Sequence, residues 1–382
     1  MYMTTTETVS TSWFSRLGNS LKNILIGLLL IIGAIALLFW NEGRAVMTEQ
    51  SLKEGLSAVV SVNADKKDTN NEGKLIHFFG VAKISDILAD NEFGVNASAL
   101  KMKRIVEVYQ WKEKSTSKTN EKLGGGTETT TTYSYSKEWT DNLIDSSKFK
   151  EADFHQNPSS KLFVDKEWLS SGVTVGAYTI SENMLSSLPG YQSYTITPEM
   201  INNKIATPST ELQLIGNILY YRTKDPAAPE IGNTRVRYEA ILPQAISVIY
   251  KQSGELLTPY QTKNGESIKM IQLGKFTAEE MFKNAQENNK TMTWILRVVG
   301  TVLMFIGFQL ILGVLPVIGS VVPFIGSIIG VGVGLVSAIA TIIVTSSVVA
   351  IAWIFYRPIL GIGLLIIAVG GLYFLMKKSK KI

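Results

Sequence analysis

Two histidines, His77 and His155, are the only imidazole side chains in this 382-residue chain, and cysteine is absent. His155 lies in the polar run Asp153-Phe154-His155-Gln156-Asn157-Pro158-Ser159. A carboxylate and a hydroxyl on either side of a histidine are the groups that a hydrolase or lipid-modifying enzyme would use for acid–base chemistry. The same run is typical of a turn whose side chains bond to its backbone, and we favour that interpretation.

Other reaction centres find no support in the pattern of residues. His77 lies in an apolar, strand-like stretch, where a structural imidazole is expected, and two distant histidines without cysteine form no metal-binding motif. The glycines of Gly124–Gly126 are flanked by threonines rather than by the lysine of a phosphate-binding loop. The sequence therefore predicts a protein that is not an enzyme and that holds no cofactor and no metal.

Long apolar runs occupy both ends of the chain. Between Val298 and Met376 the only charged residue is Arg357, and a separate apolar run covers residues 21–40. A helix needs about 20 apolar residues to cross a bilayer, and backbone within lipid must bond to itself. We therefore predict a bundle of four membrane spans, at residues 21–40 and at about 293–315, 330–355 and 359–376 of a C-terminal membrane domain, 293–376.

Two features of these spans leave alternatives. A signal peptide competes with an anchor at residues 21–40, but Trp40 and Glu42 stand where a small-residue cleavage site would follow, which favours an uncleaved anchor. Pro316 and Pro323 interrupt the second apolar run, because proline breaks helical hydrogen bonding. The segment 316–329 is then a re-entrant turn, an interfacial helix or a bend that leads into the third span.

The distribution of lysine and arginine predicts which side each part faces. Four spans put both termini on one side, and the basic tail 377–382 indicates that this side is the cytoplasm. The N-terminal segment 1–20, with Arg16, is then cytoplasmic, and residues 41–292 form an extracytoplasmic or luminal domain. The tail also accounts for part of the net charge of +5, so no nucleic-acid partner is expected.

The central segment is predicted to be a β-rich α+β domain with flanking helices. Residues 100–111 alternate apolar and polar side chains, as a half-buried strand does, and similar strands are predicted at residues 74–84, 133–139, 174–180, 216–222, 235–242, 245–250 and 267–273. Residues 115–132, rich in Thr, Ser, Gly and Lys, are a mobile loop or a hairpin tip. Thr277 followed by Glu280 predicts a capped helix that begins near Ala278 and runs toward the second span.

The predicted topology brings aromatic and charged residues to the same outer edge of the bilayer. This membrane-interface cluster comprises Trp40, Glu42, Arg44, Trp294, Arg297, Trp353, Tyr356 and Arg357. Tryptophan and tyrosine are enriched at that level, and long basic side chains reach from it to the headgroups. Either each charge meets the headgroups independently, or Glu42 pairs with Arg297 or Arg357 and holds the first helix against the others.

Small residues recur at four-residue spacing in the third span, at Gly326, Gly330, Gly334 and Ala338. Such a stripe allows two helix backbones to approach closely. The stripe packs against other helices of the same chain, or it mediates self-association. No polar stripe lines the spans, so a channel is not indicated.

Several short segments also carry a family pattern. They are Asn41-Glu42-Gly43-Arg44-Ala45-Val46, Asn71-Glu72-Gly73-Lys74-Leu75-Ile76-His77, Val108-Tyr109-Gln110-Trp111, Tyr133-Ser134-Tyr135 with Glu138-Trp139, Asn157-Pro158-Ser159, Pro229-Glu230-Ile231-Gly232 with Arg235-Val236, residues 276–282, Thr293-Trp294 with Leu296-Arg297, and Trp353 with Tyr356-Arg357-Pro358. In this order they resemble the transmembrane protein 43 family, also called LUMA. The apolar stretch 313–333 is longer and richer in glycine than in animal members.

The resemblance implies a four-span protein with a luminal or periplasmic domain, placed in the endoplasmic reticulum and inner nuclear membrane of eukaryotes or in the cytoplasmic membrane of a bacterium. It implies a scaffold that organises membrane protein complexes or a membrane patch and associates with itself, with lamins and emerin as partners in animals and with other envelope proteins in bacteria. It supplies no catalytic residues. The alternative is a lipid-binding or lipid- or envelope-modifying protein.

Overall fold

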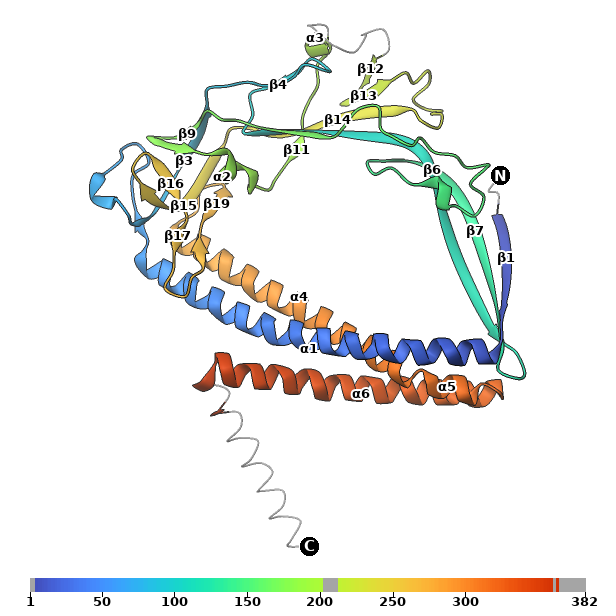
Figure 1. Ribbon diagram of the computed structural model, residues 1–382. Helices are drawn as coiled ribbons and strands as arrows, with labels where there is room; N and C mark the ends of the chain where they lie inside the picture. Colours follow the sequence, from blue (N-terminus) through green and yellow to red (C-terminus); the bar gives the residue numbers. More distant parts are fainter. Residues whose placement is uncertain (1–3, 202–211, 360–361, 364–382) are drawn as a thin grey trace. The chain divides into compact units, whose positions relative to one another are not determined.

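The chain divides into two compact units. The structure is a computed structural model that describes residues 4–201, 212–359 and 362–363 (Figure 1). We call the first unit, Met1–Thr6, Glu54–Thr116 and Thr132–Phe282, the β unit, and the second, Glu7–Lys53, Ser117–Thr131 and Lys283–Ile382, the helical unit. The helical unit thus combines three separate stretches of the sequence, one of which, Ser117–Thr131, belongs by sequence to the predicted central domain.

Three helices of the described chain are long and apolar enough to cross a membrane. The helices are α1 (Trp13–Ala58), α4 (Ala278–Leu312), α5 (Val314–Gly319) and α6 (Pro323–Tyr356), with α4 and α5 counted together as one candidate span. The predicted first span lies within α1, which also includes the helix that we expected after it. The predicted fourth span, 359–376, and the basic tail fall almost entirely outside the described residues.

The start of α4 follows the capping-box prediction. The Thr277 backbone N–H donates to Glu280 Oε2 at 2.8 Å, and the Glu280 N–H donates to Thr277 Oγ1 at 3.2 Å. These two bonds satisfy donors that a helix start leaves open. From there α4 continues without a break into the second apolar run, as the sequence predicts.

The segment 316–329 belongs to two helices. Its first part completes α5, a turn follows, and Pro323 opens α6. Proline at the first position of a helix loses no intrahelical hydrogen bond, which explains why Pro323 begins this helix. The third apolar helix therefore begins at Pro323 rather than at residue 330, and the prediction of a bend that leads into the third span comes nearest to the structure.

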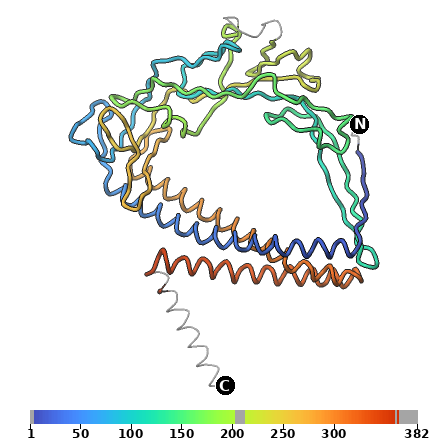
Figure 2. Tube along the Cα trace, in the orientation of Figure 1, coloured from blue at the N-terminus to red at the C-terminus, as the bar shows by residue number. Residues whose placement is uncertain are grey.

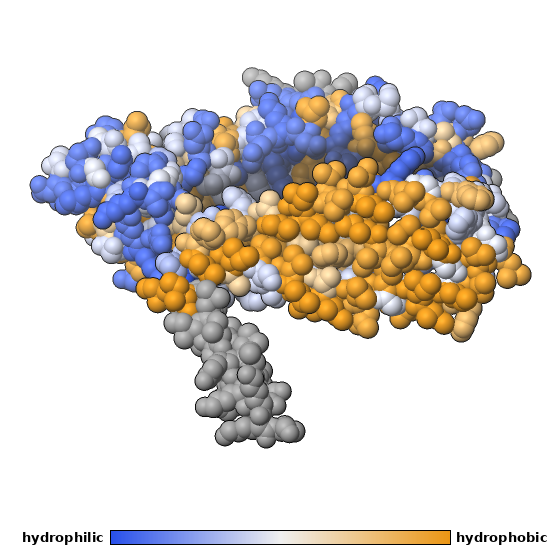
Figure 3. All heavy atoms as spheres, turned by 60° about the horizontal axis from the view of Figure 1, so that its bottom comes forward, coloured by the Kyte–Doolittle hydropathy of each residue, from blue (hydrophilic) through white to orange (hydrophobic). Residues whose placement is uncertain are grey.

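The three long helices pack side by side through small and aliphatic side chains. Figure 2 shows their traces running alongside one another, and Ala34, Leu38, Met304 and Val348 form a buried cluster between them. Elsewhere these helices expose their apolar side chains, and Figure 3 shows a broad hydrophobic face over them. Such extensive apolar exposure is expected of helices whose surroundings are lipid.

The β unit contains most of the strands, arranged in two larger sheets. The strands are β1 (Thr4–Thr11), β2 (Val60–Ser61), β3 (Leu75–Ile84), β4 (Leu88–Asp90), β5 (Val95–Ala97), β6 (Lys101–Glu121), β7 (Thr127–Thr140), β8 (Lys166–Leu169), β9 (Val173–Val175), β10 (Tyr178–Ile180), β11 (Gln192–Ser193), β12 (Leu212–Ile215), β13 (Ile218–Tyr221), β14 (Thr234–Ile241), β15 (Ala245–Ser253), β16 (Leu256–Thr258), β17 (Tyr260–Gln261), β18 (Ser267–Ile268) and β19 (Met270–Leu273). Two short helices, α2 (Glu182–Ser186) and α3 (Pro198–Ile201), lie among them.

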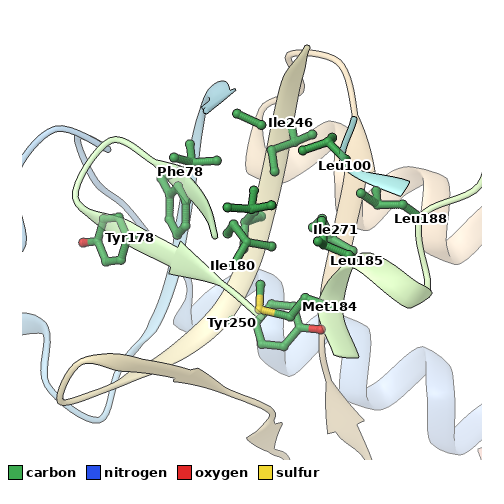
Figure 4. Close-up of a cluster of buried hydrophobic side chains, with 14 of the residues drawn as sticks. Phe78, Leu100, Tyr178, Ile180, Met184, Leu185, Leu188, Ile246, Tyr250 and Ile271 are labelled. Carbon is green, nitrogen blue, oxygen red and sulfur yellow. The ribbon is translucent and has the colours of Figure 1, made fainter. Parts of the chain in front are cut away.

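Each larger sheet is built around one long antiparallel pair. One sheet has the order β1-β7-β6-β14-β13-β12, with β8 also beside β6 and β11 beside β14. The other has the order β10-β9-β3-β15-β16, with β2 beside β3 and β19 beside β15. In the second sheet Phe78 pairs with Val248, and the core beneath includes Tyr178, stacked on Phe78, and Ile180 (Figure 4).

Strands β6 and β7 extend into a long hairpin whose tip belongs to the helical unit. Trp13 Nε1 donates to Val317 O at 2.7 Å, the Gly124 N–H donates to Val321 O at 3.1 Å, and Arg16 pairs with Glu121 at 2.9 Å. The hairpin alternative for residues 115–132 is therefore confirmed. The tip lies at the first turns of α1, beside the turn between α5 and α6.

Candidate functional site at the ends of the membrane helices

A buried carboxylate joins the three long helices. Glu42 on α1, 2% exposed, accepts from Arg297 Nε at 2.6 Å and Nη2 at 2.8 Å on α4, and from Trp353 Nε1 at 2.8 Å on α6. The bidentate geometry uses both carboxylate oxygens and is the strongest arrangement of this kind. Of the two arginines considered from sequence, Glu42 thus pairs with Arg297. We call Glu42, Arg297 and Trp353 the ionic hub.

Arg357 pairs with a different carboxylate, Glu49, which lies about two helical turns after Glu42 on α1. Its Nη2 lies 2.6 Å from Glu49 Oε2, and Lys53 Nζ lies 2.7 Å from Glu49 Oε1. Glu42 and Glu49 are seven residues apart, so they share one face of the helix. That spacing could have revealed Glu49, which the sequence analysis did not single out.

Arg44 contacts amide and hydroxyl oxygens. Its guanidinium donates to Asn289 Oδ1 at 2.9 Å, Thr293 Oγ1 at 3.0 Å and Asn41 Oδ1 at 3.3 Å. Asn41 and Asn289 in turn donate from their amides to Thr293 O and Ala45 O across the two helices. This polar seam between α1 and α4 lies directly beyond the apolar packing of the same two helices.

The predicted aromatic members take different positions. The Tyr356 ring lies against Gly43, where a Cβ atom would be 2.6 Å from the ring, and 5.4 Å from the Phe39 ring. The Trp294 and Trp353 ring centroids lie 4.9 and 5.9 Å from the Arg297 guanidinium carbon, close enough for a cation–π contribution. Trp40 remains 56% exposed and does not line the site.

An open pocket adjoins the hub. It has a volume of about 340 Å³ and is lined from α1, α4 and the end of α6 by Glu42, Ala45, Glu49, Lys53, Gln286, Asn289, Lys290, Thr293, Trp294, Arg297, Trp353 and Arg357. We call it the interface pocket. It contains four cations and two carboxylates, a surplus of two positive charges.

The small-residue stripe of α6 contacts its own chain. A Cβ atom on Gly326 would lie 2.7 Å from Ser320 Cα, one on Gly330 would lie 3.9 Å from Pro316, and one on Gly334 would lie 3.7 Å from Gln309. Ala338 is half-buried. These contacts with α4, α5 and the following turn support the alternative of packing within the chain.

Both histidines occupy structural positions. His155, 2% exposed, stacks on Tyr135 with ring centroids 3.7 Å apart and meets Trp111 edge-on at 4.6 Å, while its Nδ1 lies 3.1 Å from Glu151 O. His77 is 3% exposed and bonds to Ser61 and to Phe276 O. Both imidazole rings are therefore enclosed by neighbouring side chains and backbone.

Among the described residues, no group of three acidic or histidine side chains is placed to hold a metal ion. The β unit does contain a buried charged group that the sequence analysis did not single out. Arg104 contacts Asp90 Oδ2 at 2.8 Å and Glu92 Oε2 at 2.6 Å, and Tyr238 donates to Asp90 at 2.6 Å. Burial alone would lower the pKa of Arg104, but Asp90, Tyr238 and Glu92 act together against burial and raise it. The group ties β4, β6 and β14 together and is structural.

A polar β unit attached to long, lipid-compatible helices defines this chain as a membrane protein with a large β-rich domain. The profile of the family described as "Transmembrane protein 43" matches residues 108–358, and the chain belongs to this family. Transmembrane protein 43 of Mus musculus is 30% identical over 359 residues, which cover 91% of this chain and 88% of the mouse protein.

Other relatives are similar over the same extent. Transmembrane protein 43 of Homo sapiens is 29% identical over 358 residues, 91% of this chain and 88% of its own. The Transmembrane protein 43 homolog of Drosophila melanogaster is 27% identical over 362 residues, 90% and 91% of the two chains. No solved structure matches this chain. The family resemblance drawn from the sequence is thus confirmed.

Proposed function

We propose that this chain is a non-enzymatic membrane scaffold that organises other membrane or envelope proteins through its β unit. The observation that carries the proposal is the ionic hub, in which one buried carboxylate is bonded to both other long helices. A hub of this kind holds a fixed arrangement of helices, because charge-assisted, bidentate hydrogen bonds fix the geometry of the groups that they join.

The connections between the units support the same proposal. Helices α1 and α4 each pass from the helical unit into the β unit without a break. A domain carried on continuous helices suits the presentation of a binding surface. The names of the relatives state no catalytic activity, and the buried setting of His155 weakens the case for a hydrolase.

Self-association remains part of the proposal, although the α6 stripe does not support it. The relevant surface would be the exposed apolar side chains of the three long helices, which lipid or a second copy can cover. The mass of the complex in mild detergent tests this, with cross-linking in the membrane before extraction. A discrete assembly larger than one chain, or a protein that repeatedly co-purifies, is the expected result.

The scaffold proposal fails if the cross-linked and extracted chain is a monomer without any reproducible protein partner. For the enzymatic alternative, His155→Gln is the useful variant, provided that its thermal unfolding shows it to be folded. Loss of any lipid- or envelope-modifying turnover in that folded variant would favour the enzyme and contradict the scaffold.

A further inference from the structure

The interface pocket has the composition of an anion site. Of its four cations, Arg297 is neutralised by Glu42, and Lys53 and Arg357 share the single charge of Glu49. Lys290 is exposed and has no carboxylate within ion-pair distance among the described residues. The side chains that line the pocket therefore carry a surplus of two positive charges.

The hub leaves part of Arg297 available to a ligand. Glu42 occupies Nε and Nη2, and Nη1 makes no hydrogen bond to the described residues. The bidentate bond to Glu42 and the rings of Trp294 and Trp353 hold the guanidinium in one orientation. A planar donor fixed in this way is suited to the oxygens of a phosphate.

The level of the pocket indicates where its ligand comes from. Its lining begins where the apolar run of α1 ends at Trp40, where that of α4 begins after Arg297, and where that of α6 ends at Tyr356. Tryptophan at such ends marks the headgroup region of a bilayer. A volume of about 340 Å³ lies at the lower end of the range of roughly 300–1,000 Å³ for small-molecule sites.

We propose that the interface pocket binds the phosphate of an anionic phospholipid headgroup, which Arg297, Arg357, Lys53 and Lys290 contact while the acyl chains remain in the bilayer beside Trp294. This inference uses the membrane placement on which the proposed function depends. The lipid would neutralise the charge surplus and contact all three long helices at once.

Lipid retention by the full chain tests the proposal. The protein is reconstituted in vesicles of equimolar phosphatidylglycerol and phosphatidylcholine and then extracted, and native mass spectrometry measures the ratio of the two bound lipids. Phosphatidylglycerol should be enriched on the wild-type chain. Lys290→Gln and Lys53→Gln should each reduce the enrichment, by roughly fivefold for a cation near an anionic surface.

Lys283→Gln is the matched control, because Lys283 is an exposed lysine of the same helix that does not line the pocket. It should retain the wild-type ratio. No enrichment in the wild type, or an equal loss in the control, would overturn the proposal. Inorganic phosphate is added in a parallel sample, and a phosphate ion retained on the wild-type chain without any enrichment of phosphatidylglycerol in the phosphate-free sample would assign the pocket to free phosphate instead of lipid.

This test is independent of the scaffold test. A monomeric chain that still enriches phosphatidylglycerol would retain the headgroup site and lose the scaffold. An assembly that shows no preference between the lipids would support the scaffold and contradict the headgroup site.

Discussion

Gly27 and Gly307 place the backbones of α1 and α4 in direct contact. A methyl group on Gly27 would lie 2.7 Å from the carbonyl oxygen of Gly307, and one on Gly307 would lie 2.9 Å from the carbonyl oxygen of Gly27. Both obstacles are backbone atoms, so no side-chain rotation can relieve the overlap. The contact lies far from the ionic hub and fixes the separation of the two helices at a second point.

Gly27→Ala should therefore force the two helices apart. Over-packing of a well-filled interface costs about 1–3 kcal/mol, and backbone contact places this site at the upper end. Gly33→Ala is the matched control, because nothing lies within 4 Å of a Cβ atom there on the same helix. Thermal unfolding in detergent should show a lower midpoint for the first variant alone, and equal midpoints would contradict the packing described.

The Glu42–Arg297 pair predicts a specific rescue. Loss of one partner of a buried pair costs about 3–5 kcal/mol, because the remaining charge stays buried. Glu42→Arg should therefore destabilise the chain, and the added change Arg297→Glu should restore part of the loss, whereas Arg357→Glu should not. Resistance to proteolysis in detergent measures the effect. Equal rescue by both arginine variants would mean that the pair is not specific.

The hydroxyl of Tyr238 should contribute to the stability of the β unit. Burial, together with the charge of Asp90, raises the pKa of Tyr238, so the phenol stays protonated and donates to that carboxylate. Tyr238→Phe removes the donor and should cost about 1–3 kcal/mol. Tyr220→Phe is the control, since its hydroxyl makes no hydrogen bond to the described residues. Chemical denaturation compares the two, and equal midpoints would contradict this role.

His77 should make stability depend on pH. Burial lowers its pKa below the ordinary 6.5, although the bond to Phe276 O and the charge of Glu279 oppose this. A carbonyl can only accept, so Nε2 carries the proton and Nδ1 accepts from Ser61. Between the lowered pKa of folded His77 and the ordinary pKa of 6.5, the unfolded chain binds more protons than the folded chain. The stability is therefore retained above pH 6.5 and falls as the pH drops below that value.

The unfolding midpoint should therefore decrease on acidification from about pH 7.5 to about pH 5.5, where histidine titrates. His77→Gln should show a weaker decrease over the same interval, whatever its absolute stability. An identical slope in the two proteins would mean that His77 does not carry the effect.

The hairpin tip predicts a shared compartment. Residues in hydrogen-bond contact lie on one side of a bilayer, and Trp13 and Arg16 contact the tip and its neighbours. Single cysteines at Phe14, 79% exposed, and Leu123, 88% exposed, should therefore react with an impermeant thiol reagent from the same side. The sequence-based topology instead separates residues 1–20 from residues 41–292. Phe154→Cys in the β unit reports which side the rest of that domain occupies, and opposite labelling of Phe14→Cys and Leu123→Cys would contradict the contact.

Local patterns identified the elements of this fold that have a strong signature. The capped start of α4 and the alternation of residues 100–111 were readable because a few neighbouring side chains determine them. Strand β1 was missed, since its Thr-rich sequence has no apolar face, and β6 continues to Glu121 through residues that are polar on both sides. In those strands the pairing is set by distant partners and not by local preference.

The sequence indicated which residues lie at the site, but it did not determine how they pair. Amphipathic side chains at span ends indicated the residues, but the choice of Arg297 over Arg357 depends on the rotation of each helix about its axis. The close contact between α1 and α4 likewise depends on the rotation of each helix about its axis. The regular stripe in α6 attracted attention, whereas Gly27 and Gly307 stand in no such repeat and become important only when the two helices face each other.

The distance in sequence between the two charges of the hub has a consequence for synthesis. Glu42 precedes Arg297 by 255 residues, and a ribosome that adds about 5–20 residues each second needs roughly 10–50 s to cover that interval. During this time the nascent first helix must hold a carboxylate with no guanidinium to meet it. Because Glu42 comes shortly after Trp40, its charge stays within reach of water until Arg297 is synthesised. The order of translation therefore favours a hub at the edge of the bilayer over one at its centre.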